Sequence, residues 1–104
     1  SKPVMLDFYA DWCIACKELE AFTFTDKQVQ TALQNFVLIQ SDVTANNQQD
    51  QALLKALGLF GPPAILFFDS AGQENKNFRL VGFIGASEFL VHVERFKQYS
   101  QTSM

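Results

Sequence analysis

The feature that most constrains this chain is a pair of cysteines, Cys13 and Cys16, separated by two residues and unaccompanied by any other cysteine. They follow an apolar run, Val4–Tyr9, that predicts a buried strand, and they begin a stretch with helical character that reaches about Phe22. A disulfide between them closes so small a loop that it would stabilise a fold by only about 2 kcal/mol. The pair is therefore better explained by reactivity than by structural cross-linking.

The position of the two cysteines at the start of a helix suits redox chemistry. Cys13 is expected in the first helical turn, where free backbone N–H groups and the helix dipole stabilise a thiolate. Cys16, one turn on and facing inward, can attack a mixed disulfide formed by Cys13 and so release a partner. The alternative is half of a zinc site, but a structural zinc site needs four ligands, and only His92 remains as a nitrogen donor. The pattern predicts a redox pair and no metal.

The order of the remaining elements predicts the fold class. The chain is interpreted as β-α-β-α-β-β-α. The strands are expected at 4–9, 36–39 (ending near Asp42), 64–68 and 79–83. The helices are expected at 13–22, after a capping box at 25–28, from about Asn47 to a C-terminal cap at Gly58, and at 87–97. This order predicts an α/β fold with a mixed four-stranded sheet and helices on both faces. We expect one domain over residues 1–104, with a polar tail at about 98–104 that frays.

Charge and hydropathy exclude several classes of function. The net charge of −3 gives no support to nucleic-acid binding, which uses clustered Lys and Arg side chains. No apolar run approaches the ~20 residues of a membrane span. No signal peptide is visible ahead of the first strand, so the chain is interpreted as a mature protein or an excised domain.

Two acidic residues are expected near the thiols. Asp7 lies within a run that should be buried, and Glu20 follows Cys16 by four positions, so it can share the same helix face. A nearby carboxylate disfavours a thiolate, and burial raises the pKa of the acid itself. Together they would hold Cys13 mostly as a thiol until a partner docks, and Asp7 would relay a proton to or from Cys16. The alternatives are that Asp7 satisfies a local backbone group and that Glu20 is simply solvated.

Several segments in this order resemble the thioredoxin superfamily. They are the active-site segment 7–17, Gly61-Pro62-Pro63-Ala64 at the cis-proline loop, and Val81-Gly82-Phe83 at the third substrate-facing segment. Tyr9-Ala10-Asp11-Trp12-Cys13, Cys16-Lys17-Glu18, Val43-Thr44-Ala45-Asn46 and Ile65-Leu66-Phe67-Phe68-Asp69 more closely resemble the C-terminal periplasmic domain of the DsbD family of transmembrane thiol:disulfide interchange reductases. The resemblance extends from Lys2 to about Phe96.

The resemblance implies a protein-disulfide reductase whose only redox group is its own cysteine pair, with no cofactor. In that family the C-terminal domain takes electrons from a membrane-embedded cysteine pair and passes them to an immunoglobulin-like N-terminal domain, which reduces periplasmic isomerases and cytochrome c maturation factors. Cys13 would be the attacking thiol, Cys16 the resolving thiol, Pro63 the cis-proline facing the disulfide, and Asp7 the buried acid. We expect a monomeric domain, located in the periplasm as part of an inner-membrane protein.

Some residues depart from the thioredoxin pattern. Ile14 and Ala15 replace Gly-Pro between the cysteines, which adds apolar surface, and Gln40 stands near the place of a lysine beside the buried acid. Pro62 has no N–H, so a partner's backbone could pair there only with the Pro62 carbonyl. These departures favour a few dedicated partners. Thioredoxins also carry an additional strand and helix before this segment, so we expect a less covered face or a trimmed domain.

An apolar docking rim is expected around the thiol, because exposed apolar patches on small monomers often mark interaction sites. The residues expected to bind substrate are Trp12, Ile14, Ala15, Phe60, Pro62, Pro63 and Gly82, the last marking a close backbone approach inside a strand. Phe83 also lies near the rim but is better explained as core, like the Phe22 and Phe24 pair. The competing functions are a free-standing periplasmic thioredoxin-like reductase, an oxidase, and a thioredoxin-like binding module without turnover.

Overall fold

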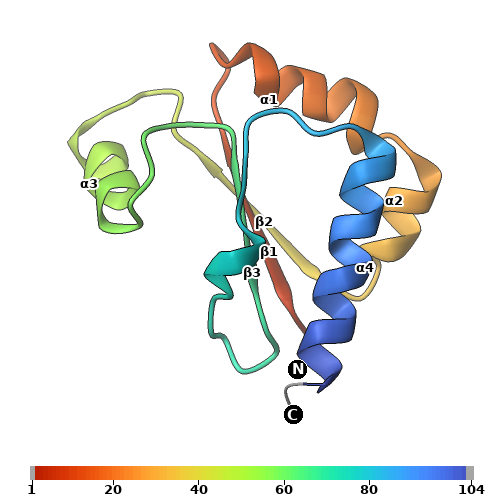
Figure 1. The fold of residues 1–104 in the computed structure, drawn as a ribbon. Coiled ribbons are helices and arrows are strands. Elements are labelled where there is room, and N and C mark those ends of the chain that lie inside the picture. Colours follow the sequence, from red (N-terminus) through yellow and green to blue (C-terminus); the bar gives the residue numbers. More distant parts are fainter. Residues whose placement is uncertain (1, 103–104) are drawn as a thin grey trace.

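A mixed four-stranded sheet forms the centre of the molecule in this computed structural model, which describes residues 2–102. The strands are β1 (Val4–Tyr9), β2 (Val37–Asp42), β3 (Ala64–Phe68) and β4 (Leu80–Val81), and they lie in the order β2-β1-β3-β4. β1 pairs in parallel with β2 and antiparallel with β3, and β4 pairs antiparallel with β3. Helices cover both faces, with α3 on one side and α2 and α4 on the other (Figure 1). The predicted fold class is confirmed.

The helices begin and end close to the predicted positions. They are α1 (Ile14–Glu18), the π-helix η1 (Leu19–Thr23), α2 (Lys27–Ala32), α3 (Gln48–Ala56), the 3-10 helix η2 (Lys76–Phe78) and α4 (Ala86–Thr102). Asp26 caps α2 by accepting a hydrogen bond from the Val29 N–H, so the predicted cap at Thr25 is one residue early. Asn47 opens α3, as expected. No helix within residues 2–102 combines the length and the apolar character that crossing a membrane requires.

The last helix is longer than its apolar pattern indicates. α4 continues to Thr102, so residues 98–102, which were expected to fray, are helical, and residues 103–104 lie outside the described residues. The ring centroid of Tyr99 lies 5.8 Å from that of Phe78, the last residue of η2. This contact gives the polar end of the helix a tertiary partner that no periodicity within the helix could reveal.

The core divides into two clusters on opposite sides of the sheet. One lies under α2 and α4 and contains Met5, Leu19, Val29, Ala32, Leu33, Phe36, Ile65, Phe67, Phe89, Val93 and Phe96. Phe24 packs edge-on against Phe89 with ring centroids 5.6 Å apart, so its predicted place in the core is confirmed. Phe22 is 65% exposed, and its prediction as core is wrong, because Thr23 takes the inward position beside it.

The second cluster lies on the α3 side and includes the two cysteines with Phe8, Ala10, Val43, Leu54, Ala64 and Leu66. β2 borders the sheet as an edge strand, which leaves Val37, Leu38 and Ile39 exposed although all three are apolar. The packing therefore concentrates around β1 and β3, the two central strands that lead to and from the cysteine region.

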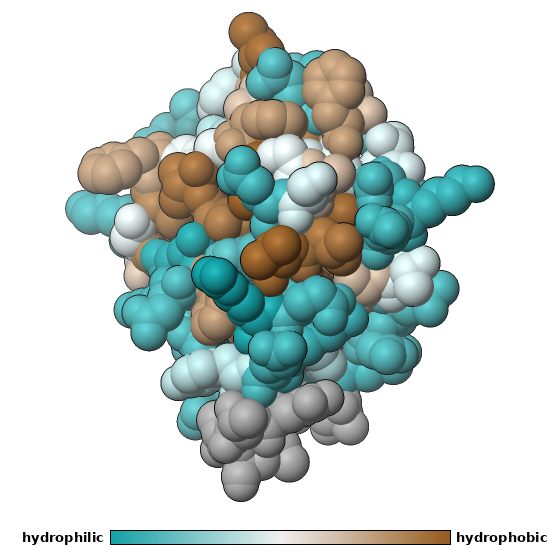
Figure 2. Space-filling model, turned by 45° about the vertical axis from the view of Figure 1, so that its right-hand side comes forward, coloured by the Kyte–Doolittle hydropathy of each residue, from teal (hydrophilic) through white to brown (hydrophobic). Residues whose placement is uncertain are grey.

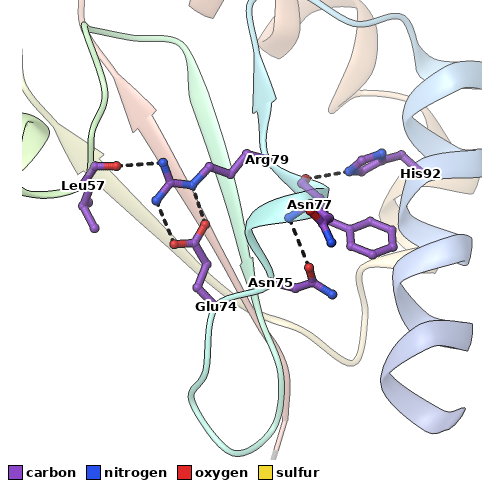
Figure 3. Close-up of polar contacts among 7 residues, drawn as sticks. Leu57, Glu74, Asn75, Asn77, Arg79 and His92 are labelled. Atoms are coloured by element: carbon purple, nitrogen blue, oxygen red, sulfur yellow. Dashed lines mark hydrogen bonds and ion pairs between the residues drawn. The ribbon is translucent and has the colours of Figure 1, made fainter. Parts of the chain in front are cut away.

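Arg79 ties the β3–β4 connection to the end of α3. The Arg79 guanidinium donates two hydrogen bonds to the Glu74 carboxylate, at 2.6 and 2.8 Å, and a third of 2.7 Å to the Leu57 carbonyl (Figure 3). Leu57 is the C-cap of α3, and the chain runs from there to the Pro62–Pro63 loop. His92, which was expected to be structural or solvent-facing, is half-buried, and its Nε2 lies 2.7 Å from the Phe78 carbonyl oxygen.

Candidate active site

The two cysteines lie where β1 ends and α1 begins, and they form a disulfide with their Cα atoms 5.3 Å apart. Cys13 is the N-cap of α1, with extended backbone angles, and so lies one residue before the first turn in which it was expected. The backbone N–H of Cys16 donates to Cys13 Sγ at 3.1 Å. A sulfur at a helix N-cap receives the free N–H groups of the first turn, and these favour its thiolate form.

The two sulfur atoms differ in their surroundings. Cys13 is 7% exposed and Cys16 3%, and Cys16 Sγ lies inward, 3.8 Å from the Phe8 carbonyl oxygen. Cys13 is therefore the more exposed residue of the pair. Cys16 is covered by the apolar cluster on the α3 side of the sheet.

Thr44 holds the turn that precedes the cysteines. Its Oγ1 accepts a hydrogen bond from the Asp11 N–H and its carbonyl accepts one from Trp12 Nε1, both at 2.9 Å. The Thr44 N–H in turn donates to Asp42 at 2.8 Å. Trp12 is 56% exposed, so its indole is fixed in orientation while its face remains open to a partner. Sequence reasoning missed Thr44, although Asp42 two residues earlier is the signature of an Asx-turn.

Replacing Thr44 by valine will loosen this turn. The substitution removes the Oγ1 acceptor of the Asp11 N–H and the hydroxyl donor to Asp42, and loss of each such hydrogen bond costs about 1 kcal/mol of unfolding free energy. Trp12 is the only tryptophan in the chain, so its fluorescence anisotropy reports directly on the turn and will fall. Thr44→Ser keeps the hydroxyl and is the matched control. Unchanged stability and anisotropy in Thr44→Val would show that the turn does not depend on this side chain.

Two further loops meet each other where β3 begins. The Pro62–Pro63 peptide bond is cis, as the resemblance implied, and the Gly82 N–H donates to the Pro63 carbonyl at 3.2 Å. Gly82 lies just after β4 with φ +90°, and a Cβ placed on it would meet no heavy atom within 4 Å. No neighbouring atom therefore excludes a side chain at this position, and the positive φ is what favours glycine there. Ala64, which follows Pro63, belongs to the same buried cluster as the cysteines.

Apolar side chains are exposed in all three segments. Trp12 and Phe60 are exposed, and so are Ile14, at 78%, and Phe83, at 45%. The expectation that Phe83 is core is wrong, because β4 ends at Val81 and the alternation of the strand ends with it. Ala15 and Pro62 are half-buried and Pro63 is buried. Figure 2 shows hydrophobic side chains gathered in the upper half of the view, the end at which α1 begins in Figure 1.

Asp7 lies on β1, half-buried between β2 and β3. Its pKa is raised to about 6, chiefly by burial; a hydrogen bond with the Gln40 side chain lowers the pKa, and the charge of Glu20 raises it. Glu20 is exposed in η1, whereas Cys16 is buried, so the two do not share the inward face. Asp7 directly precedes Phe8, whose carbonyl lies beside Cys16, and it lines a surface groove of about 440 Å³ with Gln40. The carboxyl thus has a path to solvent.

The site holds a redox-active disulfide. Within residues 2–102, no three His, Cys, Asp or Glu side chains gather in a way that could hold a metal ion. The arrangement can carry out thiol–disulfide exchange at Cys13, backed by a second sulfur in bonding distance.

Comparison with known proteins agrees with this chemistry. The model of the thioredoxin-like domain family matches residues 1–97. The chain is 60% identical over 92 residues to the thiol:disulfide interchange protein DsbD of Salmonella paratyphi A and 59% identical over 92 residues to that of Escherichia coli K12. Each match covers 88% of this chain and 16% of the relative, so the chain spans about a sixth of the length of these relatives.

Two solved structures extend the comparison to the fold. The C-terminal domain of DsbD from Neisseria meningitidis, in its oxidised form, is 46% identical with a TM-score of 0.73, and the match covers 93% of this chain and 79% of that domain. A thioredoxin from Thermus thermophilus is 26% identical with a TM-score of 0.76, over 91% of this chain and 73% of that protein.

Proposed function

This chain belongs to the thioredoxin-like domain family, and within it to the C-terminal domains of DsbD, and on that premise we propose that its thiol:disulfide oxidoreductase centre works as a reductase relay between redox proteins. The observation that carries the proposal is the Cys13–Cys16 disulfide at the N-terminus of α1. One sulfur accepts a helix N–H and the other lies inward, which matches the division of labour between attacking and resolving thiols.

The exchange conserves atoms and electrons. In the reduced domain the Cys13 thiolate attacks one sulfur of a partner's disulfide, which forms a mixed disulfide and expels the partner's other sulfur as a thiolate. The Cys16 thiolate then attacks Cys13 Sγ, so the internal disulfide forms and the second partner sulfur leaves. The partner gains two electrons and two protons. A donor dithiol reverses these steps on Cys13 and is itself oxidised to a disulfide.

The partners in this proposal are redox domains. The donor is a membrane-embedded cysteine pair and the acceptor is an immunoglobulin-like N-terminal domain, with the exchange in the periplasm as part of an inner-membrane protein that serves electron transport and cytochrome c biogenesis. The basis is the identity with proteins named DsbD, of which this chain spans 16%. The net charge of −3 adds no support for nucleic-acid partners.

Asp7 and Glu20 restrain the thiols in this proposal. A carboxyl group with a pKa of about 6 is available both to accept and to donate a proton near neutral pH, so Asp7 supplies or removes the proton of Cys16 during exchange. Glu20 adds negative charge, which favours the protonated form of Asp7. Alkylation rates measured against pH will test this role. Asp7→Asn is expected to shift the Cys13 profile, and an unmoved profile would contradict the role.

Partner choice rests on side chains more than on backbone pairing. The Pro63 carbonyl already accepts the Gly82 N–H, and Pro62 has no N–H to offer. A docked segment therefore has the Pro62 carbonyl as its backbone acceptor in this loop. Recognition then depends on the apolar residues around the disulfide, Trp12, Ile14, Ala15, Phe60, Pro62, Pro63 and Gly82.

The direction of electron flow decides between this relay and its alternatives. We expect an equilibrium potential near the thioredoxin value of about −270 mV, measured against glutathione, rather than the about −120 mV of strong oxidants. Mixing the reduced chain with an oxidised immunoglobulin-like domain of a DsbD relative should oxidise Cys13 and Cys16 and reduce that domain. If the reduced chain reduces insulin as fast as it reduces that domain, a free-standing thioredoxin-like reductase is favoured. Binding without electron transfer would favour a module without turnover.

A further inference from the structure

Thr23 is a buried residue that the exchange steps above do not use. Within the part of the chain whose side chains are described, it is the only polar residue with no exposed surface. Its Oγ1 donates a hydrogen bond of 2.5 Å to the carbonyl of Ile84, a residue 61 positions later in the chain. Burying a hydroxyl group without a hydrogen-bond partner costs free energy, so the hydrogen bond to Ile84 stabilises Thr23 in its buried position.

The helix geometry explains why Thr23 faces inward. α1 continues directly into the π-helix η1, in which the Phe24 N–H donates to the Leu19 carbonyl at 2.9 Å, five residues earlier. Cys16, Leu19 and Thr23 are spaced i, i+3 and i+7, and all three are buried. Thr23 is therefore on the buried side of the same continuous helix that carries the inner cysteine. Single turns of π-helix occur frequently at functional sites.

The Ile84 carbonyl belongs to the segment 82–85, which joins β4 to α4 and passes beside the helix of the cysteines (Figure 1). The segment has two other backbone contacts. Gly82 donates to the Pro63 carbonyl at 3.2 Å, and the Gly85 carbonyl accepts the Phe89 N–H of α4 at 2.9 Å. Thr23 thus connects the helix of the cysteines to the segment 82–85, and Gly82 connects that segment to the cis-proline loop.

We propose that Thr23 is a positioning residue for exchange with protein partners. Its hydroxyl fixes the segment 82–85 against the helix of the cysteines, so Gly82, Phe83 and the cis-proline loop keep a constant distance from Cys13 Sγ. The proposal rests on the reductase function above, because the segment matters only when a folded or extended partner docks. A small disulfide needs contact with Cys13 alone and does not depend on the segment.

Three substitutions separate positioning from simple packing. Thr23→Val keeps the branched shape but removes the hydroxyl, which leaves the Ile84 carbonyl without its donor. Thr23→Ser keeps the hydroxyl and loses a methyl group, so it is the rescue control. Thr23→Ala also lacks the hydroxyl and places no methyl group against the carbonyl, and it replaces the valine variant if that variant does not fold.

The test compares two rates for each reduced, folded variant, one toward the oxidised immunoglobulin-like domain of a DsbD relative and one toward the small disulfide 5,5′-dithiobis(2-nitrobenzoate). We expect Thr23→Val to reduce that domain about tenfold more slowly, less than the ~100-fold that a 1 Å misplacement can cost, with an unchanged rate toward the small disulfide. Thr23→Ser should match the wild type on both.

Two outcomes would overturn the proposal and differ in what they say of the function. If the wild type reduces the immunoglobulin-like domain and Thr23→Val does so at the same rate, or loses both rates equally, Thr23 is a packing residue and the reductase function stands. If the wild type reduces the small disulfide but no protein disulfide, the reductase function itself fails, and the positioning role fails with it.

Discussion

Cys16→Ser will turn the domain from a catalyst into a trap for its partners. Cys13 keeps its place at the N-cap of α1, where the backbone N–H of residue 16 points at its sulfur, so it still attacks a partner's disulfide. The mixed disulfide then has no internal thiolate to resolve it. Non-reducing electrophoresis and intact mass will show a stoichiometric covalent complex, and multiple-turnover reduction will fall to the uncatalysed level.

Cys13→Ser is the matched control for this experiment. It leaves Cys16, which is 3% exposed and covered by the apolar cluster, so it should form no complex and reduce nothing. If Cys13→Ser traps the partner and Cys16→Ser does not, Cys16 is the attacking thiol and Cys13 the resolving thiol. The absence of a complex from both variants, with a partner that the wild type reduces, would remove the mixed-disulfide mechanism.

Asp7→Asn will stabilise the domain near neutral pH. The pKa of Asp7 rises from 3.8 to about 6 in the folded chain, chiefly because the carboxyl is buried. At 1.36 kcal/mol for each pKa unit, this difference of about 2.2 units corresponds to at most about 3 kcal/mol of unfolding free energy at pH 7. Asparagine carries no charge to desolvate and can still hydrogen-bond to Gln40, so the variant recovers much of that energy.

The sign of the pH dependence follows from the raised pKa. The fold favours protonated Asp7, so its contribution to stability is complete below about pH 4 and is lost as the pH rises through about 6. In denaturant unfolding of the oxidised wild type, Asp7 should lower the free energy of unfolding near pH 7 relative to pH 4. Asp7→Asn should remove that contribution. Glu20→Gln, at an exposed position, is the control and should change stability by less than about 0.5 kcal/mol.

A difference in unfolding free energy between the wild type and Asp7→Asn that does not change between about pH 4 and pH 7, or an Asp7→Asn variant that is less stable near pH 7, would contradict this account. The expected result has a functional reading. A charge held in an apolar setting at a cost to stability is a common trade between stability and activity, and Asp7 lies beside the strand residue whose carbonyl meets Cys16.

Much of this protein could be predicted from the sequence because the relevant signals are local. The spacing of Cys13 and Cys16, the apolar run of Val4–Tyr9 and the position of Asp7 within it are all read within a few residues. Each depends on the period of one helix or strand, and that period is set by backbone geometry. The redox pair, the fold class and the half-buried Asp7 could accordingly all be predicted without the structure.

Tertiary structure alone decided which side chains meet. Thr23 replaces Phe22 in the interior because a carbonyl 61 positions away accepts its hydroxyl, and Thr44 holds Trp12 from 32 positions away. Phe83 is exposed because β4 ends two residues earlier. A periodic pattern shows which face of an element is apolar, but the fold determines what covers that face and where each buried hydroxyl finds its partner. Those long-range contacts, rather than the cysteine pair itself, set the shape that a partner of Cys13 meets.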